Sequence, residues 1–211
     1  MSRSGDFKYI SIMENDNNDS LLKQTFVTQT HGYSDVSTKR DMWRQIAVEQ
    51  NGEFSISRTS GNVLEIHKLY ILYKGCEIKI TESDTRPLKF EIEFDSLLDY
   101  NMTIGWEGAV ERLLKRIGLK EIETGNEKFD NNYLIKSKDS GKTINFFTPE
   151  IMSCLLKYNV YSVSYQTNSK KRKANLLSTI TRTNSEKNAI VDLIELHKNM
   201  IDRLKVLRIV E

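Results

Sequence analysis

The chain has 211 residues, of which 38% are hydrophobic and 28% are charged; this composition supports a packed core and excludes a disordered chain. Its 31 Lys and Arg residues nearly balance its 29 Asp and Glu residues, and the formal net charge of +2 neither requires nor excludes an anionic partner. The two cysteines lie on unrelated segments and form neither a disulfide framework nor a zinc-binding spacing, so we interpret them as buried free thiols in a reducing compartment.

The N-terminal residues predict no targeting segment. Residues 1–9 contain Arg3, Asp6 and Lys8 and lack the apolar core of a secretory leader. No stretch of the sequence approaches the roughly 20 apolar residues that a membrane-spanning helix needs. We therefore expect a soluble, cytoplasmic protein of bacterial type.

The first part of the chain predicts a polar lead-in and then a helix. Residues 1–24 include a polar run without periodicity, and we expect them to be a weakly ordered lead-in to one α+β domain over residues 25–211. A helix is predicted from Lys39 to Gln50, with Thr38 as its N-terminal cap. The Asn51-Gly52 pair that follows suits a left-handed helix end.

A run of strands is predicted next, at Glu53–Ser57, Val63–Tyr73, Cys76–Thr81 and Lys89–Asp95. Apolar residues on both faces of the second strand predict a central strand covered on both sides. Lys74-Gly75 predicts a turn. In the last strand Phe90, Ile92 and Phe94 form one face and charged residues form the other, which is typical of a half-buried antiparallel strand.

The row of three carboxylates on that last strand could suggest a pair of residues for acid–base catalysis. Glu91, Glu93 and Asp95 all lie on its solvent side, and Lys79 and Lys89 are expected nearby. Catalytic pairs need environments that separate their pKa values, which a shared wet face does not provide. We interpret the row as a solvated, charge-paired face.

The second half of the sequence predicts three helices and three strands. They are a helix over Gly105–Ile117, a strand over Tyr133–Ser137, a helix that starts at Thr148-Pro149-Glu150, a hairpin of Val160–Tyr165 and Asn175–Thr181, and a final helix after the capping box Thr183–Glu186. The predicted fold is α+β: a mainly antiparallel sheet packed by amphipathic helices, with a long C-terminal helix.

A weak internal echo suggests duplication. The helix and turn over Trp43–Gly52 are followed by one strand, and the helix and turn over Ile151–Asn159 are followed by another. The corresponding sub-units would be residues 25–118 and 119–211. Coincidence within an α+β chain is the alternative.

One series of short motifs carries a resemblance. Thr124-Gly125, Phe129-Asp130, an aromatic-led strand from Tyr133, Thr148-Pro149-Glu150 and Leu155-Leu156 follow one another in this order. The series resembles bacterial families of unknown function, over about Leu119–Leu207, although Asn126 stands where an acid is common.

The resemblance implies a fold and no activity. The residues themselves suggest that Thr124-Gly125 forms a turn, that Phe129 and Tyr133 anchor the strand, and that Asp130 accepts hydrogen bonds from nearby amides. A ligand-binding role for Asp130 is the alternative.

The remaining motifs predict no catalytic, cofactor-binding or metal-binding residues. Ser140–Thr143 resembles the end of a phosphate-binding loop but lacks the preceding glycine, so we expect a polar turn. His31, His67 and His197 are widely spaced, and we expect His197 to be partly buried and hydrogen-bonded. Cys154 has no local base, although a triad assembled from remote residues stays open.

The most pronounced charge feature is the run Lys170, Lys171, Arg172 and Lys173, which is predicted to project from a hairpin tip. It is interpreted either as a solvated loop or as a partner-binding site. The favoured hypothesis is a non-catalytic protein-binding module, of an immunity or accessory type, without cofactors. The alternatives are a small-ligand-binding protein or enzyme, and contact of the basic hairpin with nucleic acid or another anionic surface.

Overall fold

The computed structural model describes residues 36–58, 65–83, 86–106, 120–180 and 186–211. The chain divides into two units, Met1–Lys39 and Arg40–Glu211, and the second contains the sheet. The predicted lead-in, the helix expected after Gly105 and the first three residues of the capping box at Thr183 lie outside the described residues.

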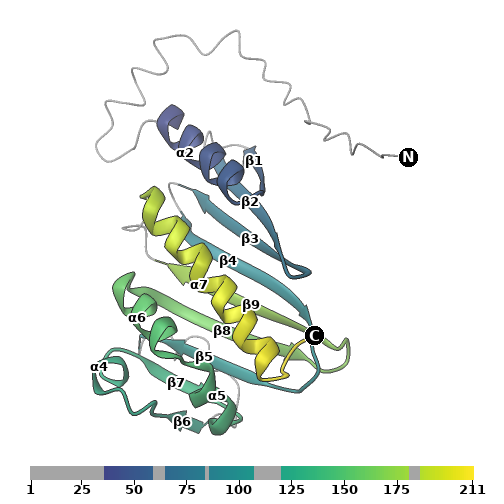
Figure 1. Ribbon diagram of the computed structural model, residues 1–211, viewed down its shortest axis with the longest axis vertical. Helices are drawn as coiled ribbons and strands as arrows, with labels where there is room; N and C mark the ends of the chain where they lie inside the picture. Colours follow the sequence, from purple (N-terminus) through teal and green to yellow (C-terminus); the bar gives the residue numbers. More distant parts are fainter. Residues whose placement is uncertain (1–35, 59–64, 84–85, 107–119, 181–185) are drawn as a thin grey trace. The chain divides into compact units, whose positions relative to one another are not determined.

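The described strands form one nine-stranded antiparallel sheet (Figure 1). They are Glu53–Arg58 (β1), Glu65–Tyr73 (β2), Cys76–Ser83 (β3), Arg86–Asp95 (β4), Asn101–Gly105 (β5), Lys120–Ile122 (β6), Leu134–Ser137 (β7), Val160–Asn168 (β8) and Lys173–Ile180 (β9). Their order across the sheet is β1-β2-β3-β4-β9-β8-β5-β7-β6. The last strand in the sequence therefore lies in the middle of the sheet.

The described helices pack on one face of this sheet. They are Val36–Glu49 (α2), Glu127–Asp130 (α4), Ser140–Phe146 (α5), Pro149–Lys157 (α6) and Lys187–Val206 (α7). Trp43 of α2 stacks on Phe54 of β1, and His197 of α7 stacks on Phe90 of β4. The long helix α7 crosses the sheet (Figure 1). The predicted α+β fold with an antiparallel sheet and a long C-terminal helix is confirmed.

Local sequence signals account for several element ends. Thr148 caps α6 by accepting a hydrogen bond from the Ile151 amide, and Pro149 is the first helical residue, as predicted. Asn51 adopts the left-handed conformation, with φ of 51°, and Lys74 and Gly75 turn the chain between β2 and β3. The capping role predicted for Thr38 is wrong, because α2 begins at Val36 and Thr38 lies inside it.

One strand prediction and one helix prediction are also wrong. In β2 Leu69 and Ile71 are buried but Leu72 is 75% exposed, because helices cover only one face of the sheet at this strand. Gly105 ends the unpredicted strand β5 and does not start a helix. A side chain at Gly105 would meet the Tyr161 carbonyl at 2.8 Å, so this glycine allows β5 to approach β8 closely.

The two helix–strand junctions of the suggested duplication share one detail. Asn51 after α2 and Asn159 after α6 both adopt the left-handed conformation. However, β5 of the first half lies between β8 and β7 of the second half, so the two halves do not form separate sets of strands. Duplication stays a hypothesis.

Candidate interaction surfaces

The Thr124–Asp130 segment is held together by one carboxylate. Asp130 accepts hydrogen bonds from the Thr124 amide at 3.0 Å, from the Thr124 hydroxyl at 2.8 Å and from the Gly125 amide at 2.9 Å. Gly125 has φ of 83°, a conformation that favours glycine. The predicted turn and the predicted hydrogen bonding of Asp130 are confirmed, and its carboxylate is occupied by the chain itself.

The aromatic residues of the same motif series belong to the core. Phe129 and Tyr133 are buried, and their ring centroids lie 5.0 Å apart. The Tyr133 hydroxyl donates to the carbonyl of Leu155 in α6 at 2.9 Å, while burial raises the pKa of Tyr133 to about 12. This contact joins the motif at residues 124–133 to the paired leucines.

Ser140–Thr143 forms the first turn of α5 and not the expected polar turn. The Asp139 carboxylate caps this helix by accepting from the Lys142 amide, and it also pairs with the Lys142 ammonium at 2.9 Å. A phosphate would meet a carboxylate here. Thr143 is buried against Ser137 and Tyr100, with a hydroxyl–hydroxyl distance of 2.7 Å to each.

Both described histidines are buried in the core. His197 is hydrogen-bonded as predicted, with Nδ1 2.6 Å from the Leu193 carbonyl and Nε2 2.8 Å from the Ser178 hydroxyl, but it is fully and not partly buried. His67 packs beside Trp43 and Phe54, with ring centroids 6.4 and 5.8 Å away. In the part of the chain that the structure describes, no three potential ligands cluster around a metal position. His31 lies outside that part.

Both cysteines are free thiols; Cys76 is buried as expected, whereas Cys154 is only half-buried. Burial raises the pKa of the Cys76 thiol, and it raises the pKa of Cys154 to about 11. Cys154 lies at an open hollow between α6 and α7, where Lys157 and Tyr158 both bond to Asp192. A thiol with a raised pKa carries little of the nucleophilic thiolate at neutral pH.

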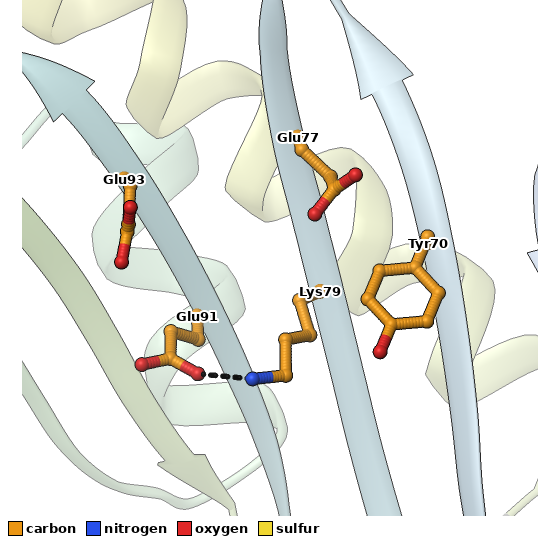
Figure 2. Close-up of a pocket in the computed structure, with 5 residues that line it drawn as sticks. All are labelled: Tyr70, Glu77, Lys79, Glu91 and Glu93. Atoms are coloured by element: carbon orange, nitrogen blue, oxygen red, sulfur yellow. Dashed lines mark hydrogen bonds and ion pairs between the residues drawn. The ribbon is translucent and has the colours of Figure 1, made fainter.

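A second hollow of about 330 Å³ lies on the sheet face opposite the helices, and we call its residues the acidic face. They are Tyr70 of β2, Glu77 and Lys79 of β3, and Glu91 and Glu93 of β4 (Figure 2). The hollow is lined by three carboxylates and one ammonium group. This hollow and the one beside Cys154 are open and carry mixed polar linings, unlike the deep apolar pocket expected of a small-ligand site.

Pairing within the acidic face is uneven. Lys79 and Glu91 form an ion pair at 3.0 Å, which raises the pKa of Lys79 and holds that of Glu91 below its usual value (Figure 2). Glu77 and Glu93 are exposed and have no ion pair with the described residues. The predicted charge pairing therefore holds for Glu91 and Asp95, because Asp95 pairs with Lys173 of β9. Glu93 of the predicted row and its neighbour Glu77 stay available to solvent.

The basic run divides into two parts. Lys170, Lys171 and Arg172 lie in the exposed turn between β8 and β9 and have no ion pair with residues of the described ranges. Lys173 is already in β9 and pairs with Asp95 of β4 at 2.6 Å. The structure therefore brings the predicted site residues together but leaves only three as a cationic tip.

Sequence reasoning missed the apolar neighbours of this tip. Leu97 and Leu98, in the connection after β4, are 51% and 39% exposed. The Ser96 amide donates to the Arg172 carbonyl at 2.9 Å, which places the two loops side by side. The sequence did contain a signal for these apolar neighbours: two adjacent leucines stand shortly after the alternating pattern of the strand ends. We call Leu97, Leu98, Lys170, Lys171 and Arg172 the hairpin surface.

Comparison with known proteins identifies the fold alone. No protein-family model and no curated protein matches the chain. The solved structure of the mycobacterial trehalose monomycolate transport factor A, TtfA, is similar, with a TM-score of 0.54 and 8% sequence identity. The similarity covers 82% of this chain and 98% of the TtfA chain. Among the helices that the structure describes, none is long and apolar enough to cross a membrane.

Proposed function

We propose that the protein is a non-catalytic binding module that recognises another protein through the acidic face. The observation that carries this proposal is the exposed carboxylate pair, Glu77 and Glu93, at an open hollow beside Tyr70. An open polar hollow suits a protruding part of a protein better than it suits a small molecule.

The residues of this face indicate the kind of partner. Tyr70 offers a rigid ring with a polar tip, the residue type that most often anchors interfaces. Glu77 and Glu93 would attract a basic segment, while Lys79 is already engaged by Glu91. Exposed charges of this kind mainly accelerate association and select among partners. A basic protein surface is therefore the expected partner class.

The similarity to TtfA supports this proposal only through the fold. That protein is named as a transport factor, and the shared fold is compatible with a protein that presents open surfaces to a partner. We keep a cytoplasmic location as part of the proposal.

The test compares two charge-matched variants in affinity enrichment from the native host with quantitative mass spectrometry. E77K/E93K reverses the acidic face, and E121K/E123K reverses two exposed glutamates in and just after edge strand β6. We expect a partner that wild type and E121K/E123K enrich equally and that E77K/E93K loses by at least about tenfold. Equal enrichment by both variants, or no enrichment by wild type, contradicts the proposal.

A further inference from the structure

We propose that the hairpin surface binds the anionic headgroup layer of a lipid bilayer. The proposal concerns a different surface from the acidic face and does not depend on it. It rests on two independent observations: three exposed cations at a turn, and two exposed leucines fixed beside them.

The three cations of the turn form no ion pair with the described residues. The turn closes through a hydrogen bond from the Lys171 amide to the Asn168 carbonyl, and Arg172 adopts the left-handed conformation with φ of 50°. Among nearby acids, Asp95 pairs with Lys173 and Asp99 pairs with Lys138 at 2.9 Å. Lys170, Lys171 and Arg172 are therefore not neutralised by an ion pair with a described residue.

The leucines are presented on a fixed backbone. The Leu97 amide donates to the Ile209 carbonyl at 3.0 Å, and the Leu98 carbonyl accepts from the Thr167 hydroxyl at 3.3 Å. Residues next to the C-terminus thus support the loop from one side and β8 supports it from the other. This backbone holds two apolar side chains at the surface, where burial against an apolar phase would be favourable.

A bilayer suits this combination better than an acidic protein does. A stable protein interface takes about 20–30 residues on each side, whereas a projecting turn and one loop supply far fewer. A membrane surface needs only lipid phosphates for the cations and the acyl boundary for the leucines. Three cations near an anionic surface strengthen binding by roughly 100-fold over a neutral tip.

The experiment is flotation of the full chain with vesicles of phosphatidylcholine alone or with 30% phosphatidylglycerol, at low and high salt. We expect wild type to float with the anionic vesicles at low salt, and at least a tenfold loss of the bound fraction in K170E/K171E/R172E. L97S/L98S should weaken flotation at both salt concentrations. R86E/K89E/K128E, which reverses three exposed cations elsewhere, should float like wild type.

Three results would overturn the proposal. They are absence of wild-type flotation, equal loss in R86E/K89E/K128E, and retention by K170E/K171E/R172E; circular dichroism establishes that each variant is folded. Binding of the wild type to a DNA duplex without flotation would instead assign the tip to nucleic acid. E77K/E93K should still float, so failure of either proposal is recognised separately.

Discussion

The buried ring of His197 makes the stability of the folded protein depend on pH. Its neutral ring donates from Nδ1 to the Leu193 carbonyl and accepts at Nε2 from the Ser178 hydroxyl, and it stacks on Phe90 with centroids 4.0 Å apart. Burial lowers the pKa of His197 from 6.5 to about 4. The folded protein therefore holds this side chain uncharged under conditions in which the unfolded chain protonates it.

Between pH 6.5 and 4 the unfolded state binds more protons at His197, so the free energy of unfolding falls as the pH is lowered through this window. From pH 7 to pH 5 this one residue should account for a loss of about 2 kcal/mol. Urea unfolding at both pH values should show that extra loss in wild type but not in H197Q. The same loss in both proteins would mean that the folded ring already carries a proton.

The Thr124–Asp130 turn shows how a recognisable motif series can be structural. Its carboxylate satisfies two amides and a hydroxyl, and the chain then enters the buried Phe129–Tyr133 segment. Tyr133 connects that segment to α6. A series of residues that resembles other protein families can therefore serve to fix the shape of one turn and its link to the core.

Replacement of Asp130 by alanine should lower the free energy of unfolding by about 1–3 kcal/mol, because it leaves partly buried donors without an acceptor. N132A is a suitable control, since Asn132 lies in the same segment and its side chain makes only an exposed bond to the Lys128 carbonyl. Thermal unfolding of both variants provides the measurement. A change below about 0.5 kcal/mol in D130A would reopen a ligand-binding role.

The whole sheet is joined at its centre by β9. This strand pairs with β4 on one side and with β8 on the other, and Leu176 faces Ile92 and Tyr165 in those pairs. All three side chains are buried beneath the helices. We therefore expect the strands on both sides of β9 to unfold together.

The L176A substitution should cost about 2–5 kcal/mol through the cavity it creates. In a W106F background, fluorescence reports Trp43 beside β1, and far-UV circular dichroism reports the whole sheet. Both urea midpoints should fall together in L176A, and by much less in L177A, whose side chain is half-buried on the other face. If the Trp43 midpoint stayed in place, the sheet would consist of separate cooperative units.

Local signals in the sequence predicted elements well and their arrangement poorly. The alternation from Phe90 to Phe94 and the Thr148-Pro149 helix start depend on neighbouring residues, and both are confirmed. Strand β5 lacks alternation because all five of its residues are buried, so no period indicated it. The meeting of Leu97 with the basic turn depends on pairing between β4 and β9, which are distant in sequence.

The central position of β9 also bears on synthesis. The first four strands can form a meander as soon as they emerge from the ribosome, yet β4 then presents a row of unpaired backbone groups until Lys173–Ile180 arrives. A chain released before β9 is made would leave the backbone hydrogen-bonding groups of β4 exposed, and another chain could pair with them. We therefore expect C-terminally truncated forms to associate into aggregates even when their first strands have folded.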